Sequence, residues 1–132
     1  MSPRARHRVA YVALALGTIV LGLWVHGNRA LGAVARDVLG DALWATMIAW
    51  WLGALAPAAR LTTRSAAAFG ICVIVEISQL IHTPLLDAIR ATTLGRLALG
   101  SGFDPRDFAA YALGVAVAVA SERAARARGA AL

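Results

Sequence analysis

The sequence predicts an all-α integral membrane bundle of four transmembrane helices, and three observations support this fold class. Of the 132 residues, 60% are hydrophobic and 15% are charged, whereas ordinary soluble domains have about 25% charged residues. Four apolar runs approach the roughly 17–25 residues that a bilayer-spanning helix needs. The arginines gather at the ends of these runs, where membrane orientation is set. We therefore expect one transmembrane domain over residues 1–132.

The first two apolar runs predict helices over residues 9–27 and 38–56. Arginines precede the first run, and a basic start before an apolar stretch is also typical of a secretory signal peptide with a cleavage site near 33–35. The sequence therefore leaves open whether the first helix is retained. Asp41 lies near the start of the second run, which stops before Pro57, a residue without a backbone N–H donor.

The other two runs predict helices over residues 65–82 and 105–123. Pro105, directly after an aspartate, is typical of a helix start. The last run is long enough to span only if Ser121, Glu122 and Arg123 snorkel to the far interface. Residues 85–103 between the two runs are too polar and glycine-rich to span, but their large aliphatic residues recur at three- to five-residue spacing. They predict a short interfacial or re-entrant helix.

The distribution of arginine predicts the orientation. All 13 basic residues are arginine, and the net charge is +6. Because these residues lie at helix ends and not in a stripe on a soluble surface, we predict no nucleic-acid partner. Topology places eight arginines on the side of the termini and five on the other side. The positive-inside rule then predicts that both termini are cytoplasmic.

Polar residues that gather toward the outer leaflet predict a binding site. Ionisable residues inside membrane segments usually face the bundle interior and mark a working site. The candidate ligand-binding residues are Asp41, Glu76, Gln79, Asp87, Arg90, Asp107 and Tyr111. Simpler roles stay open for each: helix capping for two aspartates, packing hydrogen bonds for Glu76 and Gln79, and an exposed i, i+3 pair for Asp87 and Arg90.

The sequence contains none of the motifs that carry well-known catalytic chemistry. It has no Gly-x-Ser-x-Gly elbow, no phosphate-binding glycine loop and no histidine or cysteine spacing typical of a metal site. The single cysteine, Cys72, permits no disulfide framework. We predict no catalytic residues, no metal ligands and no cofactor, and enzymatic activity is left open without being favoured.

Several short motifs nevertheless resemble those of a known group. The residues that carry the resemblance are Glu76, Gln79, His82, Pro84, Leu86, Asp87, Arg90, Gly95, Asp107, Tyr111 and Gly114, with Asp41 and Trp44 as a further element. They resemble an uncharacterised family of small bacterial inner-membrane proteins related to the VanZ-like family. Glu76, Gln79, Asp107 and Gly114 match the VanZ-like pattern, and Tyr111 replaces its asparagine. The resemblance implies a location in the bacterial cytoplasmic (inner) membrane and a role in the cell envelope.

The leading functional prediction is a cell-envelope accessory protein that binds a lipid head group or an envelope precursor in an outward-facing polar pocket. A small proton-coupled transporter is one alternative, because buried acids in membranes often relay protons. A structural membrane subunit with no ligand is another, and an enzyme acting on a lipid-linked substrate is a third. The expected partners are membrane lipids and a lipid-linked envelope precursor, and the sequence leaves homo-oligomerisation open.

Overall fold

The computed structural model describes residues 2–129, and over that range it contains six α-helices and no strand. They are α1 (Pro3–Gly27), α2 (Ala33–Leu55), α3 (Leu61–Ser78), α4 (Pro84–Ala91), α5 (Thr93–Leu99) and α6 (Asp107–Ala127). The helices α1, α2, α3 and α6 are long and apolar enough to cross a membrane. The prediction of an all-α bundle with four such helices is confirmed, and the chain is a multi-pass membrane protein.

The helix ends differ from the predicted ones for local reasons. α1 begins six residues before the predicted start at residue 9, because the Ser2 hydroxyl accepts a hydrogen bond from the Ala5 amide and caps the helix. α3 ends at Ser78, before the predicted end at residue 82. Beyond it, Thr83 has extended backbone angles (φ −128°, ψ 151°), as expected of a residue that precedes proline.

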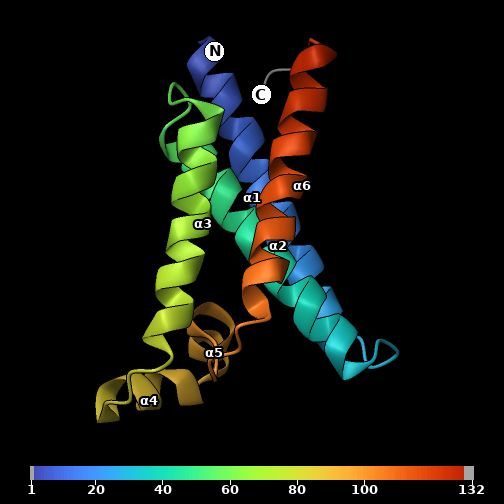
Figure 1. Ribbon diagram of the computed structural model, residues 1–132. Coiled ribbons are helices and arrows are strands. Elements are labelled where there is room, and N and C mark those ends of the chain that lie inside the picture. Colours follow the sequence, from blue (N-terminus) through green and yellow to red (C-terminus); the bar gives the residue numbers. More distant parts are fainter. Residues whose placement is uncertain (1, 130–132) are drawn as a thin grey trace.

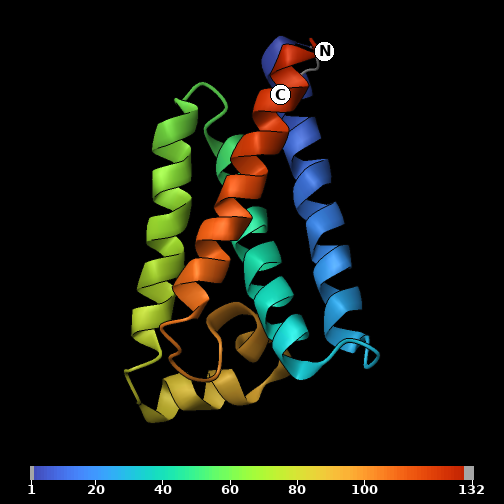
Figure 2. The same cartoon turned by 45° about the vertical axis from the view of Figure 1, so that its right-hand side comes forward.

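The four long helices form an open bundle with both described chain ends on one side (Figure 1). α1 and α2 make a long antiparallel hairpin, α2 also packs on α6, and α3 packs on α2 and α6. Figure 2 shows α4 lying across the end of the bundle opposite the chain ends, with α5 folded in above it. The bundle therefore has one end made of termini and one end covered by short helices.

Two short helices stand where the sequence predicts one. Thr92 has extended backbone angles (φ −75°, ψ 153°); it caps the C-terminal end of α4 and the N-terminal end of α5. Its hydroxyl donates to the Ile89 carbonyl at 2.7 Å and accepts from the Gly95 amide at 3.0 Å. A Cβ at position 95 would overlap the Ile89 backbone, so only glycine permits this tight junction.

The apolar interior of the bundle is made largely of small residues around a few aromatic rings, and many of the large aliphatic side chains point outward. The buried apolar residues are Tyr11, Ala15, Val25, Ala42, Ala45, Trp50, Ala54, Ala68, Cys72, Ala110, Tyr111, Val115 and Ala118. Helices in lipid associate through close backbone packing and polar contacts, which small residues allow. Val20, Leu23 and Ile74 are among the exposed aliphatic residues, and they form a surface suited to lipid chains.

A buried ion-pair cluster joins α3 and α6 at the terminal end of the bundle. Arg64 Nη2 lies 2.5 Å from Glu122 Oε1, and these side chains are only 4% and 2% exposed. Arg126 Nη2 contacts the same oxygen at 2.5 Å, and the Arg64 guanidinium lies 5.1 Å from the ring centroid of Tyr11 on α1. Glu122 therefore does not extend to the interface, as the sequence required of it for a span of sufficient length: its carboxylate turns inward because two arginines share it.

Candidate functional site

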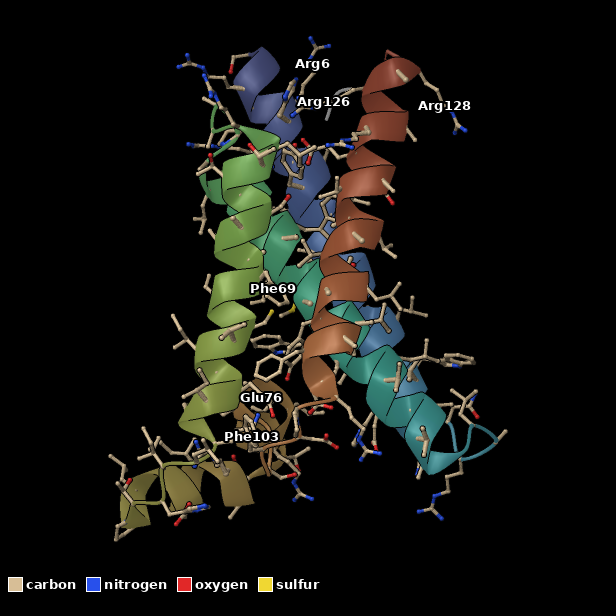
Figure 3. All side chains as sticks on the ribbon, viewed as in Figure 1. Arg6, Phe69, Glu76, Phe103, Arg126 and Arg128 are labelled. Atoms are coloured by element: carbon tan, nitrogen blue, oxygen red, sulfur yellow. The ribbon has the colours of Figure 1, made fainter. Side chains whose placement is uncertain are left out.

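Glu76 is the centre of a buried hydrogen-bond network at the α4–α5 end of the bundle (Figure 3). Its side chain, in the last turn of α3, is 0% exposed. Glu76 Oε1 accepts from the Asp104 amide at 2.7 Å, and Oε2 accepts from Gln79 Nε2 at 3.0 Å and from the Tyr111 hydroxyl at 2.7 Å. One carboxylate thus ties α3 to the loop before α6 and to the first turns of α6.

Tyr111 uses its single hydroxyl proton in this network. The side chain is buried, and its ring lies 6.1 Å from that of Trp44 on α2. A phenol has one donor, whereas an amide has two donors and an acceptor. At this position the donor is directed at Glu76, so the aromatic residue supplies the inward hydrogen bond and fills the space between α2, α3 and α6.

Gln79 is held on two sides. Its Nε2 bonds to Glu76, and its amide lies against Gly100, where a Cβ would collide with it. Gly100 has φ +71°, a backbone conformation that favours glycine. The chain therefore turns directly over the Gln79 side chain. Gln79 Oε1 is buried, and within residues 2–129 no donor reaches it.

Asp41 and Asp107 meet because α2 and α6 cross closely. A Cβ at Gly114 would overlap the Ala42 carbonyl, and the Thr46 hydroxyl lies 2.8 Å from the carbonyl oxygens of both Ala42 and Gly114. Asp41 adjoins this crossing on α2, and Asp107 lies seven residues, about two helical turns, before Gly114. Both side chains line the same cleft beside this crossing, close enough for their carboxyl groups to influence each other electrostatically.

These two acids open onto a cleft of about 820 Å³. One part of its lining is apolar and comes from α1 and α2, including Ile19, Leu23 and Met47. The other part is polar and lies toward the α2 start, α5 and the loop before α6. The titratable and amide residues of the lining are His26, Arg36, Asp37, Asp41, Gln79, Arg96, Asp104, Arg106, Asp107 and Tyr111.

The loop before α6 carries a local ion pair at the edge of this cleft. Arg106 Nη2 lies 2.6 Å from Asp104 Oδ2, and the Arg106 backbone amide also donates to Asp104 Oδ1 at 2.9 Å. Hydrogen bonds to the charged carboxylate hold the pKa of Asp104 below its usual value. The same pairing raises the pKa of Arg106. Asp104 is therefore engaged by Arg106, whereas the neighbouring Asp107 forms no ion pair within residues 2–129.

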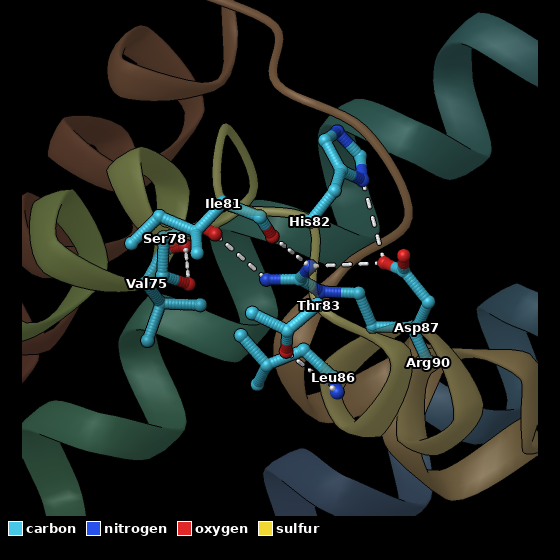
Figure 4. A network of polar contacts seen from close by, with 8 residues as sticks. All are labelled: Val75, Ser78, Ile81, His82, Thr83, Leu86, Asp87 and Arg90. Atoms are coloured by element: carbon cyan, nitrogen blue, oxygen red, sulfur yellow. Dashed lines mark hydrogen bonds and ion pairs between the residues drawn. The ribbon is translucent and has the colours of Figure 1, made fainter.

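Asp87 and Arg90 lie on α4, outside the cleft and beside the turn that follows α3 (Figure 4). Arg90 is 8% exposed, and its guanidinium donates to the carbonyls of Ser78 and Ile81, both at 2.8 Å. It closes the C-terminal end of α3, where carbonyls otherwise lack donors. Asp87 is half-exposed, 3.7 Å from Arg90 and 3.3 Å from His82.

Residues 30–115 match the family described as "Protein of unknown function (DUF2809)". The chain belongs to this family. No solved structure matches it. The matched DUF2809 region runs from the start of α2 to the middle of α6 and contains all seven candidate ligand-binding residues.

Within this DUF2809 region, the structure divides the seven predicted residues into three groups. Asp41, Gln79, Asp107 and Tyr111 line the cleft. Glu76 lies behind the lining, where it anchors Gln79 and Tyr111. Arg90 closes the end of α3 with Asp87 beside it, outside the cleft, so the predicted single pocket does not bring all seven residues together.

Sequence reasoning missed three basic residues of the DUF2809 cleft: Arg36, Arg96 and Arg106. They counted only toward orientation, although Arg36 and Arg106 directly precede Asp37 and Asp107 at helix starts, a signal that pointed to the same end of the bundle. Within residues 2–129, no three of the His, Cys, Asp and Glu side chains form a group that could hold a metal ion. The cleft offers hydrogen-bonding and charged groups of both signs beside an apolar wall, which suits binding of an amphipathic molecule.

Proposed function

We propose that this DUF2809 protein is a cell-envelope accessory protein of the bacterial cytoplasmic (inner) membrane. Its cleft binds the polar head group of a lipid or of a lipid-linked envelope precursor. The observation that carries this proposal is the amphipathic lining of the cleft. Ile19, Leu23 and Met47 offer an apolar wall within the membrane-spanning helices, and the charged residues gather at one end. A lipid has the same division into chain and head group.

The charge distribution supports an outward-facing cleft. Arg6, Arg126 and Arg128 lie at the end of the bundle that holds the chain ends (Figure 3), together with the other arginines of the terminal segments. The side with more arginine faces the cytoplasm in most membrane proteins. The termini are then cytoplasmic, and the head-group end of the cleft, near α5, faces outward.

The motif pattern supports a relation to the VanZ-like proteins. Glu76, Gln79, Asp107 and Gly114 stand where that pattern has its Glu, Gln, Asp and Gly. In this chain Gly114 permits the α2–α6 crossing, and Glu76 anchors the loop before α6. The residues that support a relation to the VanZ-like proteins are therefore residues that build the cleft.

Filling the cleft tests the proposal with a matched pair of variants. Gly22 lines the cleft and Gly70 does not, and both have open space where a Cβ would lie. We expect Gly22→Trp to lose lipid that remains bound to the wild-type protein in native mass spectra, while Gly70→Trp keeps it. Equal lipid retention by both variants would show that the cleft is not the binding site and would favour a structural subunit.

Proton-coupled transport is a second candidate, and the Asp41–Asp107 pair favours it. Two adjacent carboxyl groups can share one proton and release it when the helices move. On this hypothesis, proteoliposomes with an internal pH-sensitive dye show proton flux with the wild-type protein and none with Asp107→Asn. Absence of flux with the wild-type protein across the pH range removes the candidate.

A further inference from the structure

We infer that the cleft selects a phospholipid head group in which a primary ammonium adjoins a phosphate. Asp41, Asp107 and the Gln79 carbonyl oxygen bind the ammonium, and Arg36 and Arg96 bind the phosphate. The inference rests on the proposed function and specifies the ligand class. It follows from cleft residues that lack an ion-pair partner or, for Gln79 Oε1, a hydrogen-bond donor among residues 2–129.

The acid pair is the first of these observations. Asp41 and Asp107 both line the cleft, beside the close crossing of α2 and α6 at Ala42 and Gly114. Among residues 2–129, neither forms an ion pair with an arginine or histidine, although Asp104 does so nearby. Two adjacent carboxylates repel each other, so a cation bound between them relieves the repulsion.

Gln79 is the second and independent observation. Its side chain is 5% exposed, lines the same cleft, and has no donor for Oε1 among the described residues. The amide orientation follows from chemistry, because the Glu76 carboxylate only accepts hydrogen bonds and must face the Gln79 NH2 group. A buried acceptor without a donor is costly. Gln79 Oε1 therefore needs an N–H or O–H donor, which an –NH3⁺ group supplies and a trimethylammonium group does not.

Arg36 and Arg96 supply the other half of the site. Both line the cleft, and neither lies within ion-pair distance of a carboxylate in the described part of the chain. Arg106, by comparison, is engaged by Asp104. The guanidinium fork matches phosphate oxygens in a bidentate manner. Unpaired acids and unpaired arginines in one cleft complement a zwitterion better than a simple anion or cation.

A series of lipids with one variable tests the inference without any mutation. The purified protein in detergent receives equal amounts of phosphatidylethanolamine, its N-methyl and N,N-dimethyl derivatives, phosphatidylcholine and phosphatidylglycerol, all with the same acyl chains. Native mass spectrometry measures the bound fraction of each. We expect occupancy to fall stepwise as N–H donors are replaced, with about tenfold weaker binding of phosphatidylcholine. Equal binding of phosphatidylethanolamine and phosphatidylcholine overturns the inference.

Variants then show which side chains bind the ammonium and which bind the phosphate of the head group. The double variant Asp41→Asn, Asp107→Asn is expected to abolish the preference for the amine while it leaves phosphatidylglycerol bound. Arg96→Gln is expected to weaken all the phospholipids to a similar extent. Asp87→Asn is the matched control, because Asp87 lies outside the cleft, and it should leave the lipid profile unchanged. Preserved amine preference in the double variant overturns the inference.

The outcomes also distinguish this inference from the proposed function. If phospholipids bind, and Gly22→Trp releases them, but no head group is preferred, only the inference fails. If no phospholipid binds to the wild-type protein, the proposed lipid site itself fails.

Discussion

Replacing Glu76 by glutamine is the sharpest test of how the site is held together. In the structure, Oε1 accepts from the Asp104 amide, and Oε2 accepts from both Gln79 and Tyr111. A glutamine has one acceptor oxygen where the carboxylate has two. If that oxygen keeps the position between Gln79 and Tyr111, the new NH2 group points at the Asp104 N–H, and two donors face each other.

The expected loss of stability follows from these three bonds. Leaving the Asp104 N–H unpaired costs about 1–3 kcal/mol. The bonds from Gln79 and Tyr111 change from charge-assisted to neutral, and each loses roughly 1 kcal/mol. We therefore expect Glu76→Gln to lower the free energy of unfolding by about 3–5 kcal/mol. Tyr111→Phe removes one donor and should cost less, about 1–2 kcal/mol.

Unfolding by SDS in mixed micelles, followed by tryptophan fluorescence, measures these differences. Trp44 is a suitable local probe because its ring lies 6.1 Å from that of Tyr111. Asp87→Asn is the matched control: it removes one carboxylate charge near the same end of the bundle, and its side chain is half-exposed. We expect it to change stability by no more than about 0.5 kcal/mol. If Glu76→Gln unfolds at the same SDS fraction as this control, the network does not hold the site together.

Two further variants test the contacts that hold the long helices. Glu122→Ala leaves Arg64 buried without its counter-ion and should cost about 3–5 kcal/mol in the same unfolding assay; a wild-type unfolding curve would contradict a structural role for the pair. Gly114→Ala places a methyl group against the Ala42 carbonyl and should cost about 1–3 kcal/mol. Gly70→Ala, where the methyl group meets open space, is its control, and equal stability of the two alanine variants would contradict the close crossing.

The sequence predicted the four long helices well because a bilayer imposes one strong constraint on each of them. A helix that crosses lipid must be apolar over a minimum length, and this property is local. The depth of each polar residue along its helix axis was predictable for the same reason. Asp41, Glu76 and Asp107 were therefore expected at one end of the bundle.

The direction in which each polar side chain points, and the partner that it contacts, were not predictable, because both depend on residues far along the chain. Arg90 forms a local pair with Asp87 in the sequence, yet its guanidinium binds the carbonyls of Ser78 and Ile81, 12 and 9 residues earlier. Glu122 was one of three residues that had to snorkel for the last run to span, yet it pairs with Arg64 over a separation of 58 residues. Burial in lipid makes an unpaired charge costly, so such side chains take whichever partner the packing provides.

Glu76 and the Asp41–Asp107 pair have different roles, because only Glu76 has its hydrogen-bond partners within the described protein. Glu76 accepts three hydrogen bonds from the protein and does not line the cleft, so its contribution is the position of Gln79, Tyr111 and the loop before α6. Asp41 and Asp107 line the cleft without an arginine or histidine partner among residues 2–129. Glu76 variants should therefore lower stability first and lipid binding as a consequence. Aspartate variants should change which lipid binds while the bundle stays folded.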